Sequence, residues 1–171
     1  MTAVLLFGAT GDLSRRMLLP SLYGLAVDGL LGKDVRIVGT ARSSLDETAF
    51  RAMASEALAP HVAAGLGDTG RAAAFLGQLS YVLDATDKSG YRRLAEAACG
   101  TGDCGQDLSI SIFLSTAPSL FKPTIEGLAA AGLAGPNVRI GLEKPLGSDL
   151  ASSAEINDAV AAAFAESQIF R

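Results

Sequence analysis

The chain has 171 residues, of which 49% are hydrophobic and 19% charged, and its net charge at pH 7 is −4. This length and composition are typical of one globular domain with its own core, and they exclude a disordered chain. The acidic balance and the absence of tryptophan argue against a nucleic-acid partner or an anionic membrane surface, so any phosphate-binding site must be local.

Short apolar runs alternate with longer helical patterns along the chain. Because near-continuously apolar strands need cover on both faces, the alternation predicts a doubly wound, mostly parallel α/β sheet with helices on both faces. The expected strands are residues 3–7, 35–39, 80–84, 108–114 and 138–142, and the expected helices are 12 to about 31, 46–58, 71–79, 88–99, 120–131 and 149–164. Residues 166–171 look like the start of a sixth strand, so we predict that the domain 1–171 is a fragment of a longer protein.

Three local features refine these elements. Asp46 and Ser119 are suitable residues for starting helices. Pro20 falls inside the first helical pattern and predicts an irregular first helix, because proline removes a hydrogen bond and crowds the preceding turn. Residues 99–107 read as a surface loop.

No leader or membrane-spanning stretch is recognisable in the sequence, and a cytoplasmic protein is expected. The chain has two cysteines, Cys99 and Cys104. They exclude a disulfide framework, and two unremarkable reduced thiols are the simplest interpretation. A redox pair is the less favoured alternative, and a metal site is not expected because there is no second ligand pair.

A glycine turn joins the first predicted strand to the first helix. Gly8 and Gly11 flank Ala9 and Thr10 there, and glycine allows positive φ and close approach of a ligand to the backbone. The amides of the following helix start favour a pyrophosphate, which is the logic of the Rossmann dinucleotide site. The spacing is shorter than G-x-G-x-x-G, so a turn needed only for packing is the alternative, and no P-loop pattern is present.

The end of the second strand indicates which dinucleotide binds. NAD-binding domains place an acidic residue there for the ribose 2′-hydroxyl, whereas this chain has Arg42 followed by Ser43. A guanidinium pairs with a 2′-phosphate and a hydroxyl adds a donor, so we predict NADP selectivity. The alternative is that Arg42 is an ordinary surface arginine.

Four segments carry a family resemblance: FGATGDLSRRMLLPSLYGL, IVGTARSSLD, FLSTAPSLF and GLEKPLGSDLASSAEIN. In this order and spacing the chain resembles glucose-6-phosphate dehydrogenase over essentially its full length. The resemblance implies an oxidoreductase of glucose metabolism that oxidises glucose 6-phosphate to 6-phosphogluconolactone with NADP in the pentose phosphate pathway. It also implies a further α+β domain that completes the sugar site and forms a homo-oligomer.

The resemblance assigns roles residue by residue. Lys144 would contact both cofactor and sugar phosphate, Glu143 would lie by the nicotinamide, and the Lys144–Pro145 bond is one that sequence permits to be cis. The other residues implied to bind the cofactor are Gly8, Ala9, Thr10, Gly11, Asp12, Leu13, Arg42, Ser43, Asp84, Ser115 and Pro118.

The chain departs from the family pattern in two places. Met17 stands where many members have a lysine linked to substrate handling. Arg171 is followed in relatives by IDHYLGKE, with the general-base histidine further downstream. The single histidine here, His61, is not expected to act as a base, so no catalytic residue is assigned and the chain alone is expected to be inactive.

Two other functions are compatible with a glycine turn at the start of the chain. A short-chain dehydrogenase is excluded because Tyr23, Tyr81 and Tyr91 are not followed four residues later by lysine. A stand-alone NADP-binding or redox-sensing module without catalysis remains the alternative.

Overall fold

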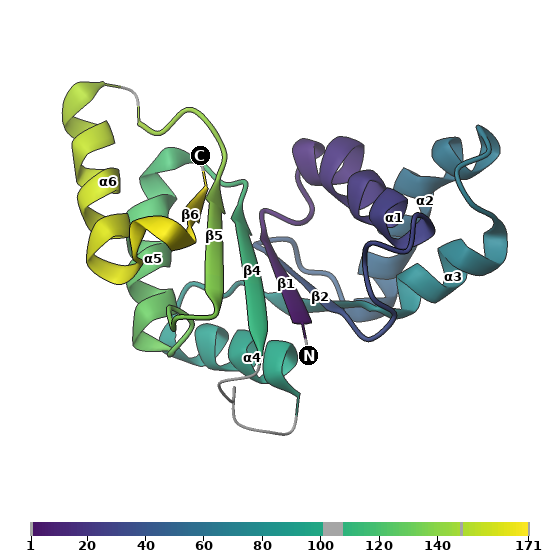
Figure 1. The fold of residues 1–171 in the computed structure, drawn as a ribbon, viewed down its shortest axis with the longest axis horizontal. Helices are drawn as coiled ribbons and strands as arrows, with labels where there is room; N and C mark the ends of the chain where they lie inside the picture. Colours follow the sequence, from purple (N-terminus) through teal and green to yellow (C-terminus); the bar gives the residue numbers. More distant parts are fainter. Residues whose placement is uncertain (1, 101–107, 148, 171) are drawn as a thin grey trace.

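The fold is built on one six-stranded sheet. The structure is a computed structural model that describes residues 2–100, 108–147 and 149–170. All its strand pairs are parallel, and the strand order is β3-β2-β1-β4-β5-β6 (Figure 1). The order reverses direction between β1 and β4, which confirms the doubly wound sheet. The strands are β1 (Thr2–Phe7), β2 (Arg36–Ala41), β3 (Leu79–Leu83), β4 (Ser109–Leu114), β5 (Val138–Leu142) and β6 (Ile169–Phe170).

Helices connect every pair of consecutive strands, as parallel pairing requires. The structure confirms all six predicted helical regions and the sixth strand, with shifts of a few residues at the ends. The helical elements are η1 (Ser14–Leu18), α1 (Leu19–Val27), α2 (Glu47–Ala63), α3 (Thr69–Gly77), α4 (Lys88–Cys99), η2 (Pro118–Leu120), α5 (Phe121–Ala130), α6 (Leu150–Ala163) and η3 (Glu166–Gln168).

The first helix is irregular, as Pro20 predicted. Residues 12–27 are helical, but Ser14–Leu18 form a π-helical turn, and Pro20 enters α1 at its first turn. A proline is tolerated there because the wide π-helical turn needs no hydrogen bond from the backbone N–H that proline lacks. The expected end near Leu31 is wrong. The helix ends at Val27 because Gly29 takes a φ of +73° and Leu30 N donates to Leu25 O, a glycine-based helix end.

The two predicted helix starts have different outcomes. Asp46 caps α2, and its carboxylate accepts a hydrogen bond of 2.7 Å from Ala49 N. Ser119 does not cap a helix, because the chain already turns at Pro118, where η2 begins and leads directly into α5. Proline is suited to a first helical turn because its φ is fixed and it has no N–H to leave unpaired.

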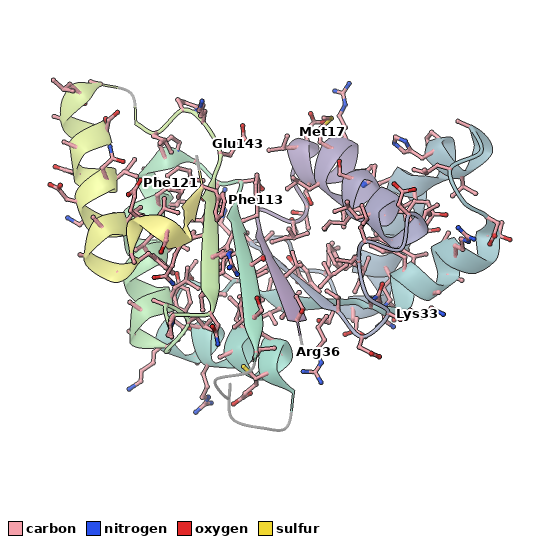
Figure 2. The ribbon with its side chains drawn as sticks, in the orientation of Figure 1. Met17, Lys33, Arg36, Phe113, Phe121 and Glu143 are labelled. Atoms are coloured by element: carbon pink, nitrogen blue, oxygen red, sulfur yellow. The ribbon has the colours of Figure 1, made fainter. Side chains whose placement is uncertain are left out.

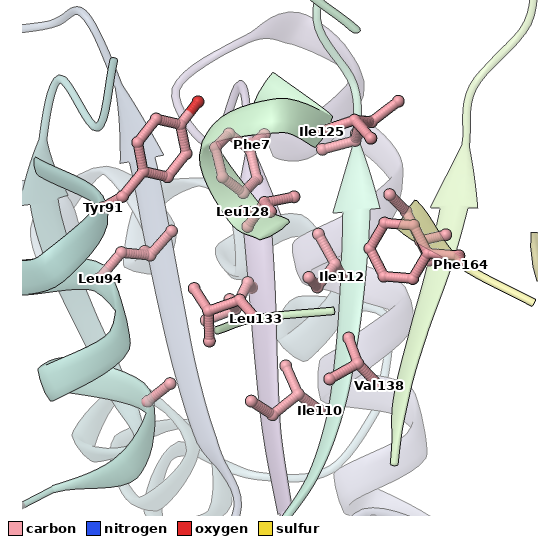
Figure 3. Packing of buried hydrophobic residues seen from close by; sticks show 14 of the residues in the cluster. Phe7, Tyr91, Leu94, Ile110, Ile112, Ile125, Leu128, Leu133, Val138 and Phe164 are labelled. Atoms are coloured by element: carbon pink, nitrogen blue, oxygen red, sulfur yellow. The ribbon is translucent and has the colours of Figure 1, made fainter. Parts of the chain in front are cut away.

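The sheet separates two hydrophobic clusters. On one face Leu6 and Ala9 pack with α1, α2 and α3 around Tyr23, Phe50 and Phe75. On the other face the alternate residues of β1, β4 and β5 pack with α4, α5 and α6, as Figure 3 shows around Ile112, Leu128 and Phe164. Burial of these side chains is the main force that holds the layers together.

One part of the first face has no helix over it within the described residues. Phe113, which Figure 2 labels, lies beside Gly141 and Phe170 across β4, β5 and β6, and Phe170 is 54% exposed. In this same described part of the chain, no helix has the length and apolar character needed to cross a bilayer.

The prediction of two free thiols is wrong for Cys99, which closes α4 and is disulfide-bonded. The other cysteine, Cys104, and most of the predicted loop 99–107 lie outside the described residues. The prediction failed because composition indicates the usual redox setting of a chain but not whether one particular cysteine is bonded.

Candidate cofactor site at the carboxyl edge of the sheet

The glycine turn is attached to both neighbouring strands. Gly8 N and Ala9 N donate to Thr40 O at the end of β2, and Ser115, just after β4, donates from N and Oγ to Phe7 O. Gly8 has a φ of +77°, and a Cβ there would lie 2.4 Å from Ser115 O. Glycine is therefore required at position 8 by the backbone itself, and the turn sits where the strand order reverses, the usual place for a ligand in such sheets.

The helix after the turn begins with N–H groups that have no partners inside the helix. Gly11 N donates to Gly8 O, which closes the turn, and Asp12 is exposed and pairs with Arg16 at 3.5 Å. Ala9 is buried and Leu13 half-buried, so these two anchor the turn, and the N–H groups open to a ligand are those of the helix start that follows Gly11. A helix start of this kind favours an anion.

Two hydroxyls join the turn to the end of β2. Thr10 Oγ1 and Ser43 Oγ lie 2.9 Å apart and share a hydrogen bond. Arg42 stands between β2 and Ser43, is exposed, and forms no ion pair with any residue that the structure describes. The predicted partners Thr10 and Ser43 are thus brought together, and Arg42, which precedes Ser43 in the chain, carries a positive charge that pairs with no described carboxylate.

Residues at the end of β3 complete this corner. Asp84 has a φ of +47°, unusual for a residue with a side chain, and its N donates to Ala41 O at 3.0 Å. The Tyr81 hydroxyl lies 2.9 Å from Ala41 O and 2.8 Å from Ser43 O. Tyr81 is not predicted from sequence as a site residue, because its place here depends on the register that pairs it with Gly39 across the folded sheet.

The ends of β4 and β5 form the other side of the candidate site. Ser115 lies against Gly8, and Pro118 opens the helical turn that follows. Glu143 N donates to Leu114 O, so Glu143 directly follows β5, and the Lys144–Pro145 peptide bond is cis. Figure 2 shows that Glu143 and Met17 both lie at this carboxyl edge, on opposite sides of the reversal point.

Other described residues do not join the site. His61 lies in the last turn of α2, next to the α2–α3 connection at the outer edge of the fold (Figure 1). Buried side-chain polar atoms without a hydrogen-bond partner number two among the described residues, Ser14 Oγ and Thr116 Oγ1. No three His, Cys, Asp or Glu side chains within residues 2–100, 108–147 and 149–170 are grouped closely enough to hold a metal ion.

The donor set suits a dinucleotide with phosphate groups. Helix-start amides follow the turn, hydroxyls flank it, and one free guanidinium lies at the end of β2. The chain carries no acidic residue from Ala41 to Leu45, and Asp46 is occupied in capping α2. These residues therefore fit a nicotinamide dinucleotide, and the segment directly after β2 offers its adenosine ribose no carboxylate that is not already engaged.

Comparison with known sequences places this chain in a family. The family model described as "Glucose-6-phosphate dehydrogenase, NAD binding domain" matches residues 5–171. Glucose-6-phosphate 1-dehydrogenase of Zymomonas mobilis is 52% identical over 172 residues, which cover 100% of this chain and 34% of that protein. The enzyme of the same name from Mycolicibacterium smegmatis is 42% identical, over 97% of this chain and 34% of its own length. The chain thus spans about a third of these relatives.

Solved structures agree with the sequence comparisons. A crystal structure of glucose-6-phosphate 1-dehydrogenase from Mycobacterium avium superimposes with a TM-score of 0.83 at 34% identity, covering 98% of this chain and 35% of that one. A structure of glucose-6-phosphate dehydrogenase in complex with its substrate glucose 6-phosphate gives 0.85 at 30% identity, covering 99% and 36%. The chain belongs to the glucose-6-phosphate dehydrogenase family and comprises its domain for binding a nicotinamide dinucleotide.

Proposed function

We propose that this chain binds NADP in preference to NAD, as part of an enzyme that oxidises glucose 6-phosphate to 6-phosphogluconolactone. The unpaired Arg42 beside Ser43 and Thr10 carries the NADP assignment. Its guanidinium would pair with the 2′-phosphate, and the hydroxyls would donate to the same oxygens. The amides after Gly11 would hold the pyrophosphate.

The reaction places further demands on the carboxyl edge. The bound cofactor supplies a hydride acceptor, and the C1 hydroxyl of the sugar must lose its proton to a base. Lys144 is the second residue after β5, where its ammonium would neutralise the phosphate of the sugar. Glu143 would flank the nicotinamide. These two roles rest on the match to the family's GLEKP segment.

The proton acceptor does not come from the described residues around this site. His61, the single histidine of the sequence, lies at the end of α2, and Glu143 is assigned to the cofactor side. We infer that the chain alone binds cofactor without turnover and that the longer protein of the pentose phosphate pathway completes the sugar site.

Calorimetric titration with NADP and NAD tests the cofactor assignment. Arg42→Ala should weaken NADP binding by about 1.5–3 kcal/mol, the usual contribution of a hydrogen bond to a charged group, or roughly 10- to 150-fold. NAD affinity should stay unchanged. Arg92→Ala is the matched control, because Arg92 is an exposed arginine on α4 paired with Glu96. Equal NADP and NAD affinities in the unaltered chain, or an Arg42→Ala effect no larger than that of Arg92→Ala, would contradict the assignment.

A separate assay addresses turnover. Glucose 6-phosphate and NADP mixed with this chain should give no reduced cofactor by absorbance, although NADP binds in the calorimeter. Reduced cofactor formed at a rate proportional to the concentration of this chain would show that the proposed inactivity is wrong.

A further inference from the structure

We propose that Tyr81 is a positioning residue for NADP selectivity, acting through the backbone of residues 41–43. This inference rests on the proposed role of Arg42. The Tyr81 hydroxyl hydrogen-bonds to the carbonyl oxygens of the residues on either side of Arg42, Ala41 and Ser43.

The hydroxyl of Tyr81 binds the segment at two points. Ala41 O lies 2.9 Å away and Ser43 O lies 2.8 Å away. A phenol has one proton to donate, so the two carbonyls share it in a three-centre bond. The carbonyls before and after Arg42 are thereby drawn to one atom, which fixes how the backbone at Arg42 is presented.

The ring of Tyr81 is held in place by the ring of Phe50. It packs on Phe50, with ring centroids 5.0 Å apart. Phe50 is fully buried, and it fits only because position 39 is glycine, where a Cβ would lie 2.6 Å from the Phe50 ring. Gly39, Phe50 and Tyr81 thus form a continuous packed support beneath the Arg42 segment, and small changes there are transmitted because the interior is close-packed.

Two further contacts hold the segment from other sides. Asp84 N donates to Ala41 O, and Thr10 shares a hydrogen bond with Ser43. Burial raises the pKa of Tyr81, and the negative charge of Asp84 raises it further, against a lowering by the bond to Ala41. The hydroxyl therefore keeps its proton and remains a donor at neutral pH. Ordering of the segment before binding reduces the entropy lost when the phosphate is captured.

Tyr81→Phe removes the hydroxyl and keeps the ring stack on Phe50. We expect NADP affinity to fall by about 3- to 10-fold, as for one neutral hydrogen bond, while NAD affinity is unchanged. Tyr23→Phe is the matched control, because it also removes a hydroxyl bonded to a backbone carbonyl, that of Asp68 at 3.3 Å, away from the site. Both affinities are measured by calorimetry, and folding of each variant is verified by its thermal unfolding midpoint.

A double-mutant cycle shows whether Tyr81 acts through Arg42. In the Arg42→Ala background, Tyr81→Phe should change NADP affinity little, because the group it positions is gone. A full 3- to 10-fold loss in that background would overturn the inference, as would equal loss of NADP and NAD affinity. If Arg42→Ala abolishes NADP preference and Tyr81→Phe leaves it intact, only this inference fails. If Arg42→Ala leaves the preference intact, the proposed function fails and this inference fails with it.

Discussion

The residues of the glycine turn show how strictly single positions are determined. Gly8 combines a φ of +77° with a contact that leaves no room for a Cβ, so both the backbone angle and the packing against Ser115 demand glycine. Ser14, a few residues on, is the opposite case. It is completely buried in the π-helical turn, and its hydroxyl has no hydrogen-bond partner. A buried hydroxyl without a partner lowers stability.

Ser14→Ala should therefore stabilise the chain by about 1 kcal/mol or more, since an unsatisfied buried polar group costs roughly 1–3 kcal/mol. The free energy of unfolding in urea measures this gain. Ser21→Ala is the control, because Ser21 is exposed on α1 and its replacement improves only helix propensity. Equal gains from both substitutions, or a loss at Ser14, would mean that the buried hydroxyl has no such cost.

At the scale of elements, four helices begin in the same way. Each has an aspartate as its N-cap, whose carboxylate accepts a hydrogen bond from the backbone N–H three residues later. These caps are Asp46 for α2, Asp68 for α3, Asp87 for α4 and Asp149 for α6. For Asp87 the bond from Gly90 N lowers the pKa of the carboxyl, with further lowering by Ser89 and Arg93. The carboxylate is thus the favoured form in the folded chain.

Asp87 should make the stability of the chain pH-dependent in a defined direction. Its folded pKa lies below the ordinary value of 3.8, so its contribution is fully present above that value and is lost as pH falls through the folded pKa. Asp87→Asn keeps an N-cap but has no titrating group. The original chain should therefore have a higher free energy of unfolding in urea than the variant at neutral pH, and the two values should converge well below pH 3.8. A difference that stays constant over that range would exclude the carboxylate as its source.

The accuracy with which a helix or strand can be predicted from the sequence depends on what determines its two ends. The predicted helix 88–99 matches α4, because Asp87 fixes its start and Gly100 its end. For the first helix the predicted start is correct and the predicted end is too late, because the end depends on the conformation of Gly29 and not on the apolar pattern. The glycine turn could be predicted, because two glycines between an apolar run and a helical pattern are a signal in the sequence itself, and Gly8 takes the positive φ that such a turn requires. Tyr81 could not, because its role comes from a register between β2 and β3 that only the folded sheet defines.

At the scale of the whole molecule, ligand binding should appear as added stability. If NADP binds the folded chain alone, a concentration of 100 times the Kd stabilises it by about 2.7 kcal/mol. For a chain of this size that corresponds to a rise of roughly 5–10 °C in the thermal midpoint. NAD at the same concentration should give a smaller rise, and Arg42→Ala should reduce the NADP effect to that level. A midpoint insensitive to NADP would mean that the folded chain does not bind it under these conditions.

The strand order also has a consequence for how the chain reaches its folded state. β1 lies at the centre of the sheet, where Leu5 pairs with Val38 of β2 on one side and with Ile112 of β4 on the other. The ribosome therefore synthesises the two neighbours of β1 at very different times. During synthesis at about 5–20 residues per second, one edge of the central strand therefore waits several seconds for β4 to emerge. Such long-range parallel pairing slows folding and leaves an apolar edge open in the meantime. Until β4 emerges, this apolar edge of β1 is therefore open to misassociation.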